Sequence, residues 1–382
     1  MKKRWIDRQQ DLLMGLLRPI AYIWMRKDAK RIVRRDSKFS FRRKEPYVMV
    51  ANHTFLFDVI HVPLRLKKVP FIIGSQTLFA QKASRFLVTK VAHVIPKSKS
   101  ATDTQTVREI INAVKRGYPI LIFPEGDTTF YGQTNYIEPS TFKLIKKLGI
   151  DVVTCKVKGG YLSKPRWATS KRKNRQIELN YEITIPKAEI KNLSVEDIEK
   201  IITQKLYHND YDYQREKMIK HPSDALAEGL ENVCYVCPHC QSLHTIETQG
   251  NALKCQACGQ TGFIDDYGFI QGFKFDNLID WDKYQKQFHQ ALHESTFQTS
   301  GMLHEVFVQD KVQHLIGQVQ MTYENETFFI KGADELKIPI KEIKEPTITL
   351  RRDFGFIFNN KHYILKLDRY SAAVIRVSQT KY

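Results

Sequence analysis

The chain has 382 residues, which is enough for two or three domains with cores of their own and excludes a single small domain. Sixty Lys and Arg against 41 Asp and Glu give a formal net charge of +19. Anionic partners are therefore expected, such as a membrane surface, a phospholipid or a nucleic acid.

Residues 1–45 are predicted to be a basic arm that associates with membranes. Fifteen Lys and Arg against four Asp lie in residues 1–44, an excess of 11 positive charges. An apolar series of about 15 residues is interleaved with them, and Arg18-Pro19 interrupts it, whereas a bilayer span needs about 20. No small-residue cleavage site follows, so a signal peptide fits poorly. We expect basic amphipathic helices that lie in the interface of an anionic membrane, the alternative being helices that pack on the next domain.

Residues 46–230 alternate between strand and helix patterns, which predicts an α/β domain. Strands are expected at 47–51, 70–74, 92–96, 118–123, 151–157 and 177–185, and helices at 55–65, 78–90, 103–116 and 138–148. Ser194 with Asp197 three residues later predicts the start of a polar helix in residues 187–230.

Asn52-His53 ends the first of these strands, and Asp58 follows five residues after the histidine. On one regular helix the two side chains would diverge by well over a third of a turn, so pairing requires a bend at residues 52–54. With that bend, the Asp58 carboxylate can accept the Nδ1 proton and leave Nε2 as a base. The other interpretation is a histidine that only bonds strand-end carbonyls.

A second apolar run, residues 118–123, ends in Pro124-Glu125-Gly126-Asp127-Thr128. Open α/β sheets bind ligands at the carboxyl ends of their strands. Asn52-His53-x4-Asp58 followed by Phe123-Pro-Glu-Gly126 resembles the glycerophospholipid acyltransferase family, whose best-known member converts lysophosphatidic acid to phosphatidic acid. The resemblance covers about residues 45–190 and includes Gly159-Gly-Tyr-Leu-Ser-Lys-Pro-Arg-Trp167.

The resemblance implies a catalytic pair, His53 and Asp58, and a lysoglycerolipid acceptor, most directly lysophosphatidic acid. It also implies acyl-CoA or acyl carrier protein as acyl donor. The substrate-binding candidates are Asn52, Lys97, Glu125, Gly126, Thr128 and Arg166. Glu125 and Gly126 can also be read as a capping carboxylate and a left-handed turn glycine.

Two departures from the family pattern concern the acceptor phosphate. The family usually has an arginine after the strand that ends here in Lys97 and Lys99, and a basic residue soon after Glu125-Gly126, where this chain has none. A lysine supplies charge without the bidentate fork of a guanidinium. Lys97 is the best replacement, and the alternatives are Arg166 or an acceptor that is not a phosphomonoester.

Two Cys-x2-Cys pairs, Cys237/Cys240 and Cys255/Cys258, lie fourteen residues apart. This spacing predicts a zinc ribbon over residues 231–262, whose zinc ion is structural because so short a segment cannot bury a core. The lesser ligand candidates are His239 and His244. Cys234 is expected to be a buried small side chain, and Cys155 has no partner by spacing, so disulfides are not expected and a reducing, cytoplasmic compartment fits.

Residues 263–382 are predicted to form a linker helix and a small β-rich domain. Trp281, Tyr284, Phe288 and Leu292 share one helical face. Seven short strand patterns follow between residues 306 and 367, and a helix is expected in 369–377. This order resembles a PH- or GRAM-type barrel, although an unrelated β-domain fits as well.

Two classes of function fit these patterns. The first is an acyltransferase, peripheral on the cytoplasmic face of the cell membrane. The second is a non-catalytic zinc-ribbon protein that binds anionic lipid or nucleic acid. The predicted ribbon carries few Lys and Arg, so nucleic acid is the less favoured partner.

Overall fold

The computed structural model describes residues 4–75, 90–97, 104–307 and 312–379. The chain divides into two compact units. The first unit comprises Met1–Thr129, Gln133–Ser163 and Asn174–Glu216, and the second comprises Phe130–Gly132, Lys164–Lys173 and Lys217–Tyr382. The predicted helix at 78–90 lies outside the described residues except for its last residue. Lys99 also lies outside them.

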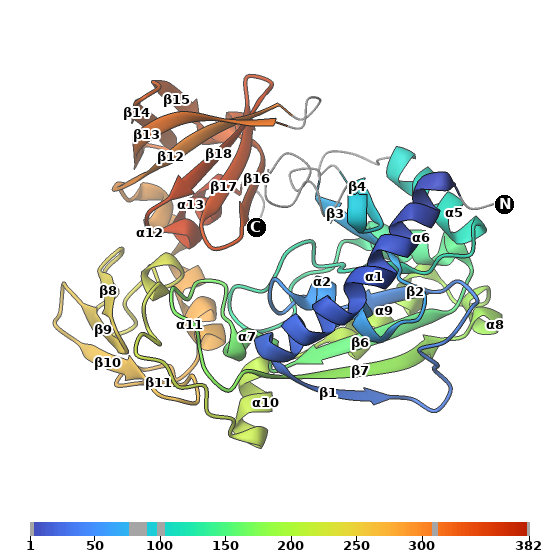
Figure 1. The fold of residues 1–382 in the computed structure, drawn as a ribbon. Coiled ribbons are helices and arrows are strands. Elements are labelled where there is room, and N and C mark those ends of the chain that lie inside the picture. The colour runs from blue at the N-terminus through green and yellow to red at the C-terminus, as the bar shows by residue number, and fades with distance from the viewer. Residues whose placement is uncertain (1–3, 76–89, 98–103, 308–311, 380–382) are drawn as a thin grey trace. The chain divides into compact units, whose positions relative to one another are not determined.

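The first unit is built on a seven-stranded sheet with the order β1-β7-β6-β2-β5-β3-β4 (Figure 1). Its strands are β1 (Lys30–Arg35), β2 (Val48–Ala51), β3 (Phe71–Ser75), β4 (Val94–Lys97), β5 (Ile120–Ile122), β6 (Val152–Lys158) and β7 (Gln176–Ile185). Neighbouring strands run parallel except β6 and β7. The predicted α/β class is confirmed, and the carboxyl ends of β2, β5, β3 and β4 lie along one edge of the sheet.

The helical segments of this unit lie before, between and after the strands. Among the described residues they are α1 (Trp5–Asp28), α2 (Asp58–His61), η1 (Pro63–Arg65), α5 (Thr104–Lys115), α6 (Pro139–Leu148), α7 (Gly160–Ser163), α8 (Lys187–Ile190), α9 (Val195–Leu206) and α10 (Asp210–Lys217). The predicted start at Ser194 is confirmed, since its hydroxyl accepts the Asp197 N–H at 3.0 Å. The predicted helix 55–65 is shorter than expected, because the chain makes a turn before α2 and continues as η1.

Both faces of β2 are buried, which fixes the strand from which the histidine emerges. Val48 and Val50 belong to one apolar cluster and Met49 and Ala51 to another on the opposite face. A parallel strand covered on both faces has an unbroken apolar sequence rather than an alternating one. The end of β2 is therefore held rigidly in the sheet.

The prediction of helices throughout residues 1–45 is wrong for residues 30–35. These residues form β1, which pairs in parallel with β7 from Lys30 opposite Gln176 to Arg35 opposite Tyr181. Ile32 and Val33 favour the extended backbone, and an edge strand tolerates basic side chains because one of its sides faces solvent.

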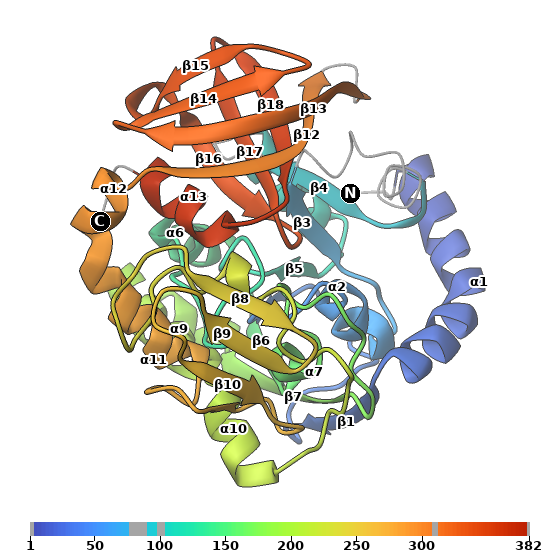
Figure 2. The ribbon, with the colours of Figure 1, turned by 90° about the vertical axis from the view of Figure 1, so that its left-hand side faces the viewer.

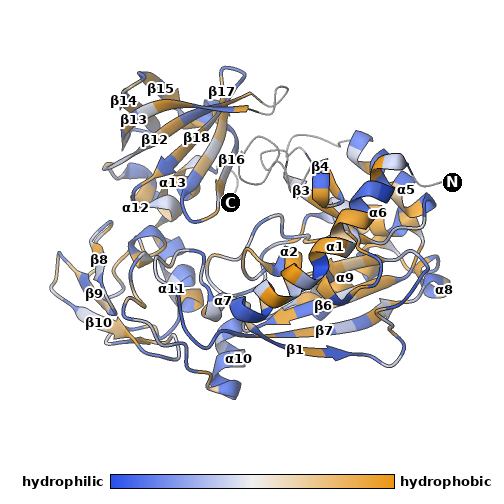
Figure 3. Cartoon of the chain, in the orientation of Figure 1, coloured by the Kyte–Doolittle hydropathy of each residue, from blue (hydrophilic) through white to orange (hydrophobic). Residues whose placement is uncertain are grey.

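Helix α1 is continuous through Arg18-Pro19, the point at which the apolar series of the sequence is interrupted. Its 24 residues extend about 36 Å. The polar residues of the helix contact the rest of the first unit. Asp7 pairs with Arg116 at 2.8 Å. The His93 ring lies 2.8 Å from Gln10 and 3.0 Å from Asp11. Apolar residues are frequent along α1, as the orange positions of the helix in Figure 3 show, and several of them are exposed. More than half exposed are Trp5, Leu12, Leu16, Ile20, Ile23 and Trp24.

This arrangement is the reverse of an ordinary surface helix, which buries its apolar stripe. Among the described residues, no helix combines the length and the apolar character needed to cross a bilayer. The apolar side of α1 is thus exposed on a helix that buried polar contacts hold to the domain.

The second unit contains a four-stranded ribbon and a seven-stranded antiparallel sheet (Figure 2). The ribbon has the order β11-β10-β9-β8. Its strands are β8 (Ile246–Gln249), β9 (Ala252–Cys255), β10 (Thr261–Ile264) and β11 (Ile270–Gln271), preceded by η3 (Leu230–Asn232). The predicted linker helix is divided into α11 (Leu278–Gln285), η4 (Lys286–Phe288) and α12 (His289–Glu294).

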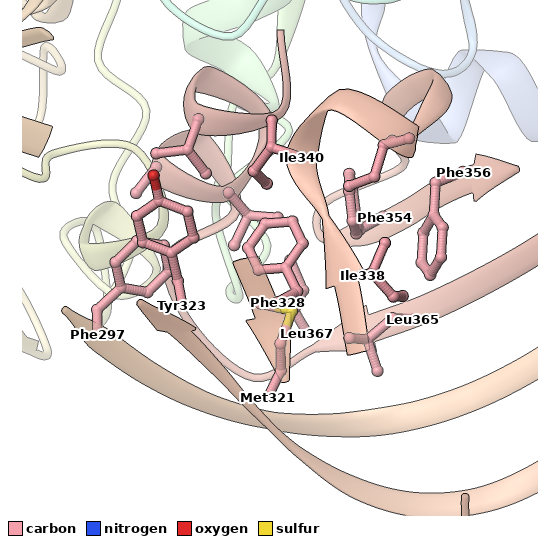
Figure 4. Packing of buried hydrophobic residues seen from close by; sticks show 14 of the residues in the cluster. Phe297, Met321, Tyr323, Phe328, Ile338, Ile340, Phe354, Phe356, Leu365 and Leu367 are labelled. Atoms are coloured by element: carbon pink, nitrogen blue, oxygen red, sulfur yellow. The ribbon is translucent and has the colours of Figure 1, made fainter. Parts of the chain in front are cut away.

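The C-terminal sheet has the order β15-β14-β13-β12-β18-β17-β16. Its elements are β12 (Phe297–Phe307), β13 (Val312–Glu324), β14 (Thr327–Gly332), β15 (Leu336–Pro339), η5 (Ile340–Glu342), β16 (Lys344–Thr349), β17 (Asp353–Phe358), β18 (Lys361–Leu367) and α13 (Ser371–Ser378). Aromatic and aliphatic side chains fill its concave side (Figure 4). The predicted seven strands and closing helix are confirmed, and the likeness to PH- or GRAM-type barrels stays a prediction.

Candidate functional site

Asp58 organises the turn that follows β2. One of its oxygens, Oδ2, lies 3.2 Å from His53 Nδ1 and accepts the backbone N–H groups of Thr54 at 2.6 Å and Phe55 at 3.0 Å. The Thr54 hydroxyl donates to the same oxygen at 3.1 Å. Asp58 is fully buried, and these donors stabilise its negative charge and fix its position. The bend predicted at residues 52–54 is present, and it brings the two side chains together.

His53 is held on one side and open on the other. Its ring packs on Phe123 with the centroids 4.5 Å apart, and its side chain remains 13% exposed. Within the described residues, no hydrogen-bond partner contacts Nε2. An imidazole whose Nδ1–H is donated to a carboxylate has a free acceptor at Nε2, which is the atom a general base uses.

Glu125 fixes the backbone of His53 from the loop after β5. Its Oε1 accepts the His53 N–H at 2.7 Å, and its Oε2 accepts the Asn135 N–H at 2.6 Å. The Thr129 N–H donates to the His53 carbonyl at 3.0 Å, so this loop holds both backbone groups of the histidine. Burial raises the pKa of Glu125 to about 8, although the two N–H donors oppose the shift, and the nearby charge of Asp58 adds to it. One Glu125 oxygen thus positions His53 and the other holds Asn135, and a substrate contact by Glu125 stays a prediction.

Asn52 clamps the end of β2 to β6. The backbone pairing of the two strands ends at Ala51 opposite Cys155. Beyond it, the Asn52 amide donates to the Val157 carbonyl at 2.8 Å and accepts the Val157 N–H at 2.7 Å. The side chain is buried and replaces a backbone ladder pair, which lets the chain leave the strand at His53. Its predicted contact with substrate stays a prediction.

Gly126 and Thr128 belong to the turn after Glu125. Gly126 has φ +74°, a left-handed conformation that favours glycine, and its N–H donates to the Phe123 carbonyl at 3.1 Å. The Thr128 N–H is bonded to the Asp127 carboxylate at 2.7 Å. The turn interpretation of Gly126 is confirmed, while the binding roles of both residues stay predictions.

Gly160 allows α7 to pack directly against the histidine turn. A Cβ at this position would lie 2.0 Å from the Thr54 hydroxyl oxygen. The Asp210 carboxylate in turn accepts the N–H groups of Gly159 at 2.7 Å and Leu162 at 2.8 Å, and it lies 2.6 Å from His208 Nε2. Asp210 and Asn135 are not predicted as site residues by the sequence, since neither belongs to a recognisable motif.

The two candidates for a phosphate contact differ in their surroundings. Lys97 is exposed at the end of β4, which lies three strands from β2, or about 14 Å across the sheet. Arg166 belongs to the second unit, where it donates to the carbonyls of Leu350 at 2.7 Å and Ile348 at 2.9 Å and stacks on Phe130. The guanidinium therefore already has backbone partners, and its predicted phosphate contact is untested.

The four predicted ligand cysteines lie together in the second unit. The sulfur atoms of Cys237, Cys240, Cys255 and Cys258 are all within 4.8 Å of one another. Those of Cys237 and Cys258 are 4.0 Å apart, and those of Cys240 and Cys255 are 3.7 Å apart. Tetrahedral zinc with bonds of about 2.3 Å places its sulfur ligands about 3.8 Å apart. The donor set and its spacing therefore fit zinc.

The two knuckles share one backbone pattern. In each, the N–H after the second cysteine donates to the carbonyl of the first, from Gln241 at 2.9 Å and from Gly259 at 3.0 Å. Both of these residues have positive φ. Neither His239 nor His244 joins the group of ligands found among the described residues. His244 packs between Phe297 and Tyr370, and burial lowers its pKa to about 4. Cys234 is buried, as expected.

The chain resembles known proteins in part of its length. Residues 32–158 match the family model described as Acyltransferase, and this stretch contains His53, Asp58 and Glu125. These residues therefore resemble an acyltransferase domain. A solved structure similar to this chain is the 1-acyl-sn-glycerophosphate (LPA) acyltransferase PlsC from Thermotoga maritima, with 16% identity, a TM-score of 0.44, and coverage of 56% of this chain and 84% of that one. No curated protein sequence matches the chain.

The raised pKa of Glu125 predicts a pH dependence of stability. The folded protein holds this proton more tightly than the unfolded chain, so the contribution is full below pH 4.5 and is lost as the pH rises through about 8. Glu125→Gln removes the titration. The free energy of unfolding of the wild type relative to this variant should therefore fall by on the order of 3 kcal/mol between pH 5 and pH 9.

Urea unfolding at the two pH values measures this difference. Glu182→Gln, at a carboxylate paired with Lys205 on the surface of the same unit, is the matched control and should show little change. A wild-type stability that runs parallel to that of Glu125→Gln across this pH range would contradict the assignment.

Proposed function

We propose that the protein transfers a fatty acyl group from a thioester donor to a hydroxyl of a lysoglycerophospholipid at a membrane surface. Lysophosphatidic acid, which would give phosphatidic acid, is the first candidate acceptor. The observation that carries the proposal is the His53–Asp58 pair, in a stretch that matches the acyltransferase family and with its backbone held by Glu125. A non-catalytic binding protein would have no need of this arrangement.

The geometry supports a general-base mechanism. His53 Nε2 accepts the proton of the acceptor hydroxyl while the hydroxyl oxygen attacks the carbonyl carbon of the thioester. The new C–O bond forms, the C–S bond breaks, and the imidazolium returns its proton to the leaving thiolate. Asp58 keeps the ring oriented and stabilises its positive form, since Nδ1 faces the carboxylate. No acyl-enzyme is required.

Lys97 and Thr128 are the candidates for a contact with the acceptor phosphate, and the donor is proposed from the match to the acyltransferase family model. Lys97 lies at the end of β4 with an exposed ammonium group, and Thr128 follows Glu125-Gly126. A lysine attracts a phosphate as a point charge. We therefore propose Lys97 as the principal phosphate contact and either acyl-CoA or acyl carrier protein as the donor.

Helix α1 supports the membrane part of the proposal. Its exposed apolar residues would enter the lipid interface, while Arg4, Arg8, Arg26 and Lys27 would meet anionic headgroups. We propose that the protein binds peripherally, on the cytoplasmic face of the membrane, through this helix.

The four cysteines support a structural zinc site. We propose that they hold one zinc ion, which would tie the hairpin containing Cys237 and Cys240 to the one containing Cys255 and Cys258. All four positions around the ion would be filled by protein sulfur, so the site leaves no place for substrate. The ion would stabilise the second unit.

Substitution of the dyad tests the proposed reaction. His53→Ala should lower kcat by on the order of 10³-fold, because the base is lost. Asp58→Asn should also lower it strongly, since an amide cannot reproduce both the turn contacts and the histidine contact. Turnover is measured with a labelled acyl donor and a lysophospholipid. His239→Ala, at an exposed histidine of the second unit, is the control, and near-normal turnover by His53→Ala would rule out the mechanism.

Substitution of the exposed face of α1 tests the membrane proposal. The double variant Leu16→Ser/Ile20→Ser should weaken binding to phosphatidylcholine vesicles tenfold or more, because less apolar area is then transferred from water to lipid. Vesicle sedimentation provides the measurement. Leu315→Ser/Leu350→Ser removes two similarly exposed leucines from the second unit and should leave binding intact. Equal losses in the two variants would count against α1.

Metal analysis tests the zinc proposal. The purified wild type should contain about one zinc per chain, Cys240→Ser should contain far less, and chelation should lower the unfolding temperature of the second unit. Cys234→Ala, at a buried cysteine outside the cluster, should retain the metal. A metal-free wild type with unchanged stability in chelator would refute the site.

A further inference from the structure

A basic pocket lies at the opposite edge of the first sheet from the dyad. Its volume is about 430 Å³, within the range of small-molecule sites. It is lined by six cations, Arg18, Arg42, Arg43, Lys44, Lys67 and Lys68, together with Asp11, Gly15 and Val69. Residues 42–44 precede β2, and residues 67–69 precede β3. The pocket therefore opens where the parallel strands begin.

Three of the cations are fixed by contacts with the domain. Arg18 donates to the Leu66 carbonyl at 2.8 Å, Arg43 pairs with the Asp151 carboxylate, and Lys68 donates to the Gly117 carbonyl. Backbone carbonyls orient Arg18 and Lys68 without neutralising them. The wall of the pocket is therefore preorganised and retains positive charge.

The other three cations have no such contacts. Arg42, Lys44 and Lys67 are exposed, and within the described part of the chain no ion pair or hydrogen bond holds their side chains. The single lining carboxylate, Asp11, accepts the Tyr118 hydroxyl at 2.7 Å and lies 3.0 Å from His93 Nε2. Its charge is directed at those two groups. Cations gathered around one hollow raise the local potential and attract an anion.

Helix α1 provides one wall of the pocket and also the exposed apolar face. Asp11, Gly15 and Arg18 line the pocket, while Leu12 and Leu16, the neighbours of Asp11 and Gly15 along the helix, are about two-thirds exposed. A molecule with its phosphate in the pocket could lay acyl chains beside these leucines. That combination is the chemistry of a membrane glycerophospholipid.

We propose that this basic pocket binds the phosphate of an anionic membrane phospholipid as a site separate from the reaction centre. The strand β2 between the two edges has four residues and spans about 13 Å, so one phosphate cannot serve both. The site would dock the protein on lipid with the reaction centre left free for substrates. The lipid assignment rests on the proposed membrane binding of α1, whereas the phosphate site itself does not depend on acyl transfer.

A pair of charge-matched variants tests the site in the full chain. Arg42→Gln/Lys67→Gln removes two uncommitted cations from the pocket. Lys143→Gln/Lys147→Gln removes two exposed cations from α6 of the same unit. Binding is measured by sedimentation with vesicles of phosphatidylcholine, with and without phosphatidylglycerol. A second arm measures the effect of soluble glycerol 3-phosphate on the unfolding temperature.

We expect the affinity of the pocket variant for the phosphatidylglycerol vesicles to fall by about tenfold or more, and that of the control variant to fall much less. Binding of both variants to pure phosphatidylcholine should be unchanged. A thermal shift by glycerol 3-phosphate that disappears only in the pocket variant, with vesicle binding intact, would keep the phosphate site but overturn its assignment to lipid. Equal losses in both variants would show a diffuse charge effect and overturn the site. Neither assay requires turnover, so an inactive enzyme would leave these outcomes readable.

Discussion

The geometry of the candidate site depends on one buried carboxylate. Asp58 gathers two backbone N–H groups, a threonine hydroxyl and the histidine Nδ1 around a single oxygen, and this arrangement turns the chain sharply after β2. A buried charge is costly unless it is fully hydrogen-bonded, so the turn and the charge stabilise each other. The same contacts that satisfy Asp58 also orient His53. Structure and proposed chemistry therefore share one set of hydrogen bonds.

The two ends of the parallel strands have different tasks in this account. At the carboxyl ends, Glu125 and Asp58 hold the backbone and ring of His53, and Asn52 clamps the strand end before it to β6. At the amino ends, exposed cations surround a hollow beside a helix whose apolar side is uncovered. Reaction and membrane docking are thus assigned to opposite edges of one sheet. Because only the four residues of β2 separate the two edges, docking on the bilayer would also fix the distance of His53 from the membrane surface.

Much of this arrangement could be predicted from the sequence because it depends on local patterns. The strands of the first unit, the bend before Asp58 and the two cysteine knuckles each follow from residues close together in the chain. The contacts of Glu125 with the N–H groups of His53 and Asn135, and of Asn52 with Val157, join distant segments and carry no local signal. Residues 30–35 were misassigned because their basic side chains resemble the arm, whereas pairing with β7 decides their conformation. The reversed orientation of α1 likewise depends on distant partners, Arg116 and His93.

The central claim, that the protein acylates a lysophospholipid, is tested most directly by identifying the product. The purified chain is incubated with labelled acyl-CoA or acyl carrier protein and with vesicles that contain one of several lysophospholipids, and the lipids are analysed by mass spectrometry. The account predicts a labelled diacyl phospholipid from at least one acceptor, with lysophosphatidic acid as the first candidate. Absence of any labelled diacyl product from a folded, membrane-bound protein, across all donors and acceptors, would contradict it.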